Sequence, residues 1–264
     1  MFNLVIGQYV PADSYIHRLD PRSKLISVFL FVIIVFLANN WVTNALMVLF
    51  CFLGIALSRL NVSFIYRGLR SVFIIVLITF LLNLFLSSGG TVLFSWGFLR
   101  VTSAGLLQSI FIAIRILVII VVTTLLTLTT SPIEITDGME SLLNPLKKIK
   151  VPVHEFALMM SISLRFIPTL LEETEKIIKA QSARGSDFTS GSLKSRVKAI
   201  VPLLVPLFVG AFKRAEDLAM AMEARGYHGD FGRTKLHQLK WDWRDTLLLA
   251  AVLLLAVLLI LARY

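Results

Sequence analysis

Five long apolar runs, separated by short polar or basic segments, limit the folds that this chain can adopt. They cover residues 25–38, 41–58, 71–86, 105–129 and 246–262. A helix needs about 20 apolar residues to cross a ~30 Å hydrocarbon layer, so the first run needs flanking residues up to about Trp41. With 57% hydrophobic residues and a mean hydropathy of +0.83, the chain has more apolar surface than one water-soluble core can hide. The sequence predicts an all-α, polytopic membrane protein with about five transmembrane helices.

Basic residues indicate on which side of the membrane each loop lies. Only Arg100 lies between the third and fourth runs, whereas six basic residues lie in the amino-terminal tail and after the second run: Arg18, Arg22, Lys24, Arg59, Arg67 and Arg70. Because cytoplasmic loops carry the excess of Lys and Arg, we expect the N-terminus in the cytoplasm and a multi-pass protein in the cell membrane. The same distribution explains the net charge of +10 without nucleic-acid binding.

Charged residues concentrate in residues 132–245, which hold 14 of the 16 acidic and 17 of the 26 basic residues. We expect three parts: a membrane part with four transmembrane helices at 1–130, cytoplasmic coupling helices at 131–243, and a C-terminal transmembrane helix at 244–264. A capping box with proline at the first helical position, Ser131-Pro132-Ile133-Glu134, predicts a helix to about Leu143.

Two longer helices are expected after this one, from near Pro152 to Ala183 and from about Leu193 to Ala224, and both contain proline. Pro168 removes a backbone donor from the first and should bend it. Two further prolines interrupt the apolar run 199–212 in the second, which is too short and too broken for a membrane span. The segment therefore predicts about three proline-bent helices, the last lying along the membrane surface or against a partner.

Both longer helices are expected to end on the same three residues, Ala183-Arg184-Gly185 and Ala224-Arg225-Gly226. One Arg-Gly ending is ordinary, because the cation complements the carbonyl end of a helix and glycine tolerates the left-handed exit. Two matched endings, 41 positions apart in a charged segment of a membrane protein, indicate two equivalent contacts with a doubled partner.

An enzyme site is not predicted, because no nucleophile with its base, metal cluster or phosphate-binding loop occurs at a usable spacing. Cys51 is the sole cysteine and lies in an apolar run, which leaves no disulfide or thiolate metal site. His154 and His228 are expected at the surface or at helix ends rather than as ligands. The acidic run at 172–175 is typical of a solvated helix face. We expect no cofactor or metal bound by this chain.

A stand-alone carrier should place polar groups along its membrane path, often on broken helices. The apolar runs offer little of this kind besides Arg115 and some threonine hydroxyls in the fourth run. Arg115 is interpreted first as a packing or pairing residue that faces the bundle interior, and a transport role is the alternative. The substrate is therefore expected to bind another subunit.

Five segments of the chain carry a resemblance to a known family: Leu19-Asp20-Pro21-Arg22-Ser23-Lys24, Thr130-Ser131-Pro132, Arg165-Phe166-Ile167-Pro168, Gln181-Ser182-Ala183-Arg184-Gly185 and Ala221-Met222-Glu223-Ala224-Arg225-Gly226-Tyr227. The paired Ala-Arg-Gly endings are the most specific of these, because many unrelated helices begin with a capping residue followed by proline. Through these segments the chain resembles the transmembrane T component of energy-coupling factor transporters nearly from end to end.

The resemblance implies a membrane scaffold whose coupling helices join two ATP-binding-cassette ATPases to a separate membrane-embedded S component, which binds a vitamin or similar micronutrient. ATP and Mg²⁺ would then bind the partner ATPases, and this chain would be a non-catalytic subunit. Each arginine would enter a groove on one ATPase and form bidentate bonds with carboxylates. The implied ATPase-binding residues are Ala183, Arg184, Gly185, Ala224, Arg225 and Gly226.

The surface under the S component is expected on the apolar halves of the two longer helices. Its candidate residues are Phe156, Met160, Leu164, Pro202 and Pro206. ATPase closure would move these helices and tilt or release the S component. The alternative is that the same side chains pack the coupling helices on each other, since buried stripes most often serve a core.

Two other functions remain open at this point. One is a stand-alone secondary carrier, and a more distant one is a membrane enzyme that acts on lipid or isoprenoid substrates. A coupling subunit requires stable association with two nucleotide-binding subunits, whereas a carrier or an enzyme should work after reconstitution alone.

Overall fold

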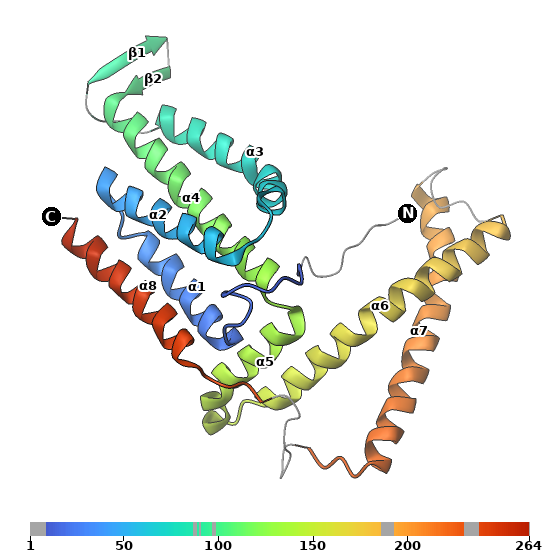
Figure 1. Ribbon diagram of the computed structural model, residues 1–264. Helices are drawn as coiled ribbons and strands as arrows, with labels where there is room; N and C mark the ends of the chain where they lie inside the picture. Colours follow the sequence, from blue (N-terminus) through green and yellow to red (C-terminus); the bar gives the residue numbers. More distant parts are fainter. Residues whose placement is uncertain are drawn as a thin grey trace. The chain divides into compact units, whose positions relative to one another are not determined.

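The computed structural model describes residues 9–86, 89, 91–96, 99–185, 193–229 and 238–263, and these are almost entirely helical (Figure 1). Met1–Leu142 and Leu239–Tyr264 form one compact unit, and Leu143–Gln238 form a second. The elements of the first unit are α1 (Pro21–Val35), α2 (Trp41–Ser58), α3 (Val62–Leu86), β1 (Val92–Trp96), β2 (Leu99–Thr102), α4 (Ser103–Thr129), α5 (Pro132–Leu143, whose last residue lies beyond this unit) and α8 (Trp243–Leu261). The second contains the 3-10 helix η1 (Asn144–Ile149), α6 (Val153–Ala183) and α7 (Leu193–Ala224).

The five apolar runs form the five long helices of the first unit, as predicted. Among the described residues, α2, α4 and α8 are each long and apolar enough to cross a membrane, and α3 holds a shorter apolar stretch at Val72–Leu86. Helix α3 packs on α4, α4 packs on α1 and α2, and α8 packs on α1 and α2 (Figure 1). The all-α class of a membrane protein is confirmed.

Helix α1 begins as its sequence predicts but ends earlier. Asp20 is the N-cap, its carboxylate accepts a hydrogen bond from the Arg22 backbone N–H at 2.8 Å, and proline fills the first helical position. The expected continuation to about Trp41 is wrong, because α1 stops at Val35 and α2 begins at Trp41. Its 15 residues rise only about 22 Å, less than the hydrocarbon thickness.

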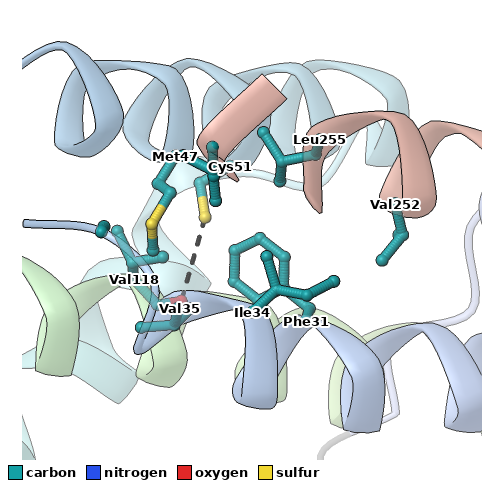
Figure 2. Close-up of a cluster of buried hydrophobic side chains, with 10 residues drawn as sticks. Phe31, Ile34, Val35, Met47, Cys51, Val118, Val252 and Leu255 are labelled. Atoms are coloured by element: carbon teal, nitrogen blue, oxygen red, sulfur yellow. Dashed lines mark hydrogen bonds between the residues drawn. The ribbon is translucent and has the colours of Figure 1, made fainter. Parts of the chain in front are cut away.

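The core of the first unit lies where α1, α2, α4 and α8 meet (Figure 2). Phe31 is 1% exposed and stacks on Phe50 with ring centroids 5.5 Å apart. The Cys51 thiol is buried and donates to the Val118 carbonyl at 3.9 Å, which satisfies the one cysteine without a disulfide. Helix α8 contributes Leu255 to the same buried cluster.

A short hairpin joins α3 to α4. Strands β1 and β2 are antiparallel, with Val92 opposite Thr102 and Trp96 opposite Leu99. The sequence predicted only a loop here, with a polar break at 87–90, most of which lies outside the described residues. Thr102 then caps α4, because its hydroxyl accepts from the Gly105 N–H at 3.1 Å.

A buried polar cluster ties the start of α1 to the start of α8. The Asp245 carboxylate, 1% exposed, accepts hydrogen bonds from the Asp20 N–H at 2.8 Å and from the Ser23 hydroxyl at 2.7 Å. The Lys24 ammonium donates to the Thr129 carbonyl at 3.0 Å. Every such bond compensates the desolvation of a buried polar group, so the cluster fixes three segments that are far apart in the sequence.

Within the first unit, the amino-terminal tail packs against α4, and α5 packs against α1. The Val10 N–H donates to the Leu128 carbonyl at 3.0 Å, and the Arg18 guanidinium, which hydrogen-bonds Asp13, lowers the pKa of that carboxyl. The capping box of α5 is confirmed, with the Ser131 N–H donating to the Glu134 carboxylate at 2.8 Å. A Cβ on Gly138 would lie 3.2 Å from side-chain atoms of α1, so α5 packs closely there.

In the second unit, α6 and α7 run antiparallel and cross (Figure 1). Both continue through their prolines as single helices, although each proline removes one backbone donor. Their bends stay a prediction. Glu173 of α6 and Arg214 of α7 form an ion pair at the crossing, and a cavity of about 330 Å³ lined by apolar residues of both helices lies beside it.

Candidate functional site

The end of α6 has the conformation that its sequence predicts. The Arg184 N–H donates to the Gln181 carbonyl at 3.1 Å, and the Gly185 N–H donates to the Ser182 carbonyl at 3.0 Å. Gly185 has a φ of 88°, in the left-handed region that favours glycine. The arginine is therefore the last residue before the chain reverses, so its side chain sits at the carbonyl end of the helix.

The end of α7 repeats this geometry. The Gly226 N–H donates to the Glu223 carbonyl at 2.9 Å, and the Tyr227 N–H donates to the Met222 carbonyl at 3.0 Å, which completes a Schellman motif. Gly226 has a φ of 72°. Both Ala-Arg-Gly segments thus form the same helix ending, as the matched sequence predicted.

Both arginines are exposed and available to a partner. Within the part of the chain that the structure describes, neither Arg184 nor Arg225 makes a hydrogen bond or salt bridge through its side chain. A Cβ added at Gly185 or Gly226 would meet no atom within 4 Å. A guanidinium in this setting can approach a carboxylate on another molecule with its planar face of donors unobstructed.

The two arginines lie the same number of residues after the two members of the Glu173–Arg214 ion pair. Arg184 lies eleven residues after Glu173, and Arg225 lies eleven residues after Arg214. At 1.5 Å per residue, each end lies roughly 16 Å along its helix from the crossing. Since the helices are antiparallel, the two ends extend from the ion pair along opposite helix directions.

The residues proposed from the sequence for the S component are mostly exposed and do not line the cavity between α6 and α7. Phe156 and Met160 are 56% and 49% exposed, Pro202 and Pro206 are exposed, and Leu164 is half-buried. The cavity between the helices is lined instead by another set: Ile162, Phe166, Leu170, Ala211, Arg214, Ala215, Leu218, Ala219 and Met222.

The interpretations of single residues in this segment hold in part. Glu172 and Glu175 are exposed, whereas Glu173 is 32% exposed and pairs with Arg214. His154 lies in the first turn of α6, at a helix end, but it is buried, with only 6% of it exposed. The Glu173–Arg214 pair was missed although a signal existed: these residues are separated by the same 41 positions as the two arginines at the helix ends.

Arg115 pairs within the bundle, as its first interpretation states. Its guanidinium donates to the Ala38 carbonyl at 2.9 Å and lies 5.2 Å from the centre of the Phe36 ring. It therefore supplies a donor to the turn that follows the short helix α1. Among the described residues, no group of three or more His, Cys, Asp or Glu side chains could hold a metal ion.

The fold and these helix ends define a polytopic helical membrane protein whose second unit presents two matched cationic ends. The CbiQ family, described as cobalt transport protein, matches residues 12–238. The chain is 61% identical over 263 residues to the energy-coupling factor transporter transmembrane protein EcfT of Bacillus subtilis (strain 168), covering 100% of this chain and 99% of the relative. It is 54% identical to the EcfT of Brevibacillus brevis, over 97% of this chain and 96% of the relative, and 49% identical to that of Lactococcus lactis subsp. cremoris, over 99% and 98%.

This similarity extends over both structural units and includes the two arginine helix ends. The chain belongs to the EcfT family of energy-coupling factor transporter transmembrane proteins, and is a membrane component of a transport system.

Proposed function

We propose that this chain is the scaffold and coupling subunit of an ATP-driven importer. It joins two ABC-type ATPases to a separate, membrane-embedded S component that binds a vitamin or similar micronutrient. The chain binds no ATP or Mg²⁺ and catalyses no reaction itself, because both ligands belong to the ATPases. It lies in the cell membrane with its N-terminus in the cytoplasm, on the side of the ATPases.

The observation that carries this proposal is the pair of matched helix ends, equally distant from the Glu173–Arg214 crossing. A partner made of two equivalent subunits offers the same groove twice, and two matched helix ends can occupy both grooves at once. In each groove the arginine forms charge-assisted bonds with a carboxylate, and the glycine after it lets the two backbones approach closely.

The apolar surface of the helices supports an S component as the second partner. Phe156, Met160, Pro202 and Pro206 are exposed, Leu164 is half-buried, and none of them lines the cavity between α6 and α7. Large exposed apolar patches mark interaction sites. Closure of the ATPases would move the two helix ends, and the rigid helices would carry that movement to the S component.

The proposal is tested by reversing both terminal charges. We expect the double variant Arg184→Glu/Arg225→Glu to insert normally and to lose co-purification with the two ATPase subunits, because each glutamate would face a like charge in its groove. The matched control is Lys179→Glu/Lys213→Glu, which makes the same charge change at exposed positions of α6 and α7.

Two results would contradict the proposal. One is equal recovery of the ATPases with the double variant and with its control. The other is solute transport by the purified chain alone after reconstitution, which would favour a stand-alone secondary carrier.

A further inference from the structure

A second cavity lies inside the first unit. Its volume is about 250 Å³, and its walls come from α1, α2, α4 and α8 together with residues 15–19 of the amino-terminal tail. Phe31, Cys51 and Val252, which Figure 2 shows in the core, form part of its wall. Pockets that enclose a whole drug-sized ligand measure about 300–1,000 Å³, so this cavity suits a segment of a chain molecule rather than an entire lipid.

One polar group of the wall has no partner. Ser27 is 5% exposed, lines the cavity, and its hydroxyl makes no hydrogen bond to any described residue. A buried hydroxyl without a partner costs free energy, which a ligand with an acceptor oxygen would offset. Most of the remaining wall is apolar, so a water molecule there would have few polar neighbours.

A cation stands at the same end of the cavity. Lys24 is the one charged residue of the lining, one helical turn before Ser27. Its ammonium N–H groups are directed to Thr129, Thr130 and His17, at 3.0, 3.3 and 3.5 Å. The carboxylates of Glu134, Asp245 and Asp20 also act on this ammonium, so its charge is compensated within the protein. Ser27 is therefore the wall residue with a donor to offer to a ligand.

The rim of the cavity faces outward from the bundle. Leu53 and Leu57 of α2 are each 51% exposed, and Leu247 of α8 is 50% exposed, although all three also line the cavity. In a membrane-embedded bundle, apolar side chains exposed in this way contact lipid tails. A lipid chain can therefore enter from the bilayer without opening the bundle.

We propose that this cavity binds one acyl chain of a membrane phospholipid, whose ester carbonyl accepts a hydrogen bond from Ser27. This site is independent of the helix ends in the second unit. Its occupant would fill the space between α1, α2 and α8 and stabilise the bundle.

The test is photocrosslinking of the purified full chain in nanodiscs with phosphatidylglycerol that carries a diazirine in one acyl chain. We expect saturable labelling of peptides that contain Leu57 and Ala251, both of which line the cavity. An ether-linked analogue of the same diazirine lipid lacks the ester carbonyl and should label about fivefold less, as the loss of one hydrogen bond predicts. Labelling without saturation, or equal labelling by the two lipids, would overturn the proposal.

Variants provide the matched comparison. Ala251→Leu adds three carbon atoms inside the cavity and should reduce labelling about tenfold, whereas Ala250→Leu makes the same change at an exposed neighbour in α8 and should not. Ser27→Ala keeps the packing and should reduce labelling about fivefold through the lost hydrogen bond. Because this change is so small, it keeps the test decisive even if Ala251→Leu lowers the yield of folded protein.

Two outcomes of the variants would overturn the proposal. One is equal labelling of wild type, Ala251→Leu and Ser27→Ala. The other is labelling that appears only when residues 1–8 are deleted, because the amino-terminal segment would then be the occupant of the cavity.

Discussion

In the first unit, charged side chains near the start of α1 and α8 are buried and hydrogen-bonded to neighbouring segments, whereas in the second unit the arginines at the helix ends are exposed. Asp245 is 1% exposed and accepts from Asp20 and Ser23, while Arg184 and Arg225 are exposed and unpaired within the described residues. Inward charges hold distant segments together, and outward ones are available to other molecules. Substitutions in the two regions should therefore affect different measurements.

The largest effect on stability is expected at Asp245. Its replacement by alanine leaves the N–H groups of Asp20 and Asp242 without their acceptor and removes one of the two acceptors of the Ser23 hydroxyl, and should lower the free energy of unfolding by about 3 kcal/mol. Thermal unfolding in detergent measures this loss. Asp242→Ala, which removes the more exposed N-cap of the same helix, should cost only about 1 kcal/mol. Similar losses for the two variants would show that the buried cluster does not hold the unit together.

The helix ends should show the reverse pattern. Arg184→Ala and Arg225→Ala should each weaken binding of the ATPases by about 2 kcal/mol, as truncation of an arginine at the centre of an interface does. Neither should change the free energy of unfolding by more than about 0.5 kcal/mol, because both residues are exposed. The two losses should also be equal, since the helix endings match. Titration of each variant with the ATPases gives the affinities, and a loss confined to one variant would break the equivalence of the ends.

A smaller effect is expected at the glycines that follow these arginines. Gly185→Ala and Gly226→Ala should each cost about 1 kcal/mol of unfolding free energy, because alanine is strained at a φ of 88° or 72° even where no neighbour obstructs it. Gly54→Ala in α2 is the control, since its Cβ would make an ordinary contact at 3.5 Å in a helical backbone. Thermal unfolding should place Gly54→Ala at or above the wild type, and a loss there as large as at the helix ends would contradict this account.

The smallest effect is the coupling between Glu173 and Arg214. Both side chains are partly exposed, at 32% and 26%, so a double-mutant cycle with alanine should give about 0.5 to 1 kcal/mol. Hydrogen exchange of α6 and α7 measures it, and the coupling should fall as salt is added. A coupling of zero would mean that apolar packing alone sets the crossing of the two helices.

Local signals in the sequence predicted where most helices begin and end. Asp20 before Pro21, the capping box at Ser131 and the glycines after the two arginines each act through bonds to residues two to five positions away. Such contacts depend on short stretches of sequence, so they could be inferred without the fold.

Contacts between distant segments could not be inferred in this way. Asp20 and Asp245 meet across 225 positions, and Arg115 bonds a carbonyl 77 positions away. The apolar run also continues to Ala38, whereas α1 stops at Val35, because hydropathy counts apolar residues and does not show where helical hydrogen bonding ends. The hairpin between α3 and α4 was missed for a similar reason, since its pairing needs two strands to be placed together.

The conformation of each arginine ending was predicted, and the ion pair between α6 and α7 was not. Each ending could be derived from its own three residues, whereas the pairing of Glu173 with Arg214 depends on how the two helices pack. His154 shows the same limit, since a histidine in a charged segment gave no sign that it would be buried.

The stretches from Glu173 to Arg184 and from Arg214 to Arg225 have equal lengths, which restricts the insertions and deletions that this chain can accept. An α-helix turns by about 100° per residue, so inserting one residue between Glu173 and Arg184 would rotate that guanidinium away from its direction and lengthen one stretch relative to the other. Only the loss of another residue from the same stretch would restore both the length and the direction. An insertion within either eleven-residue stretch should therefore be accepted only together with a deletion in that stretch, whereas the residues outside them are free of this restriction.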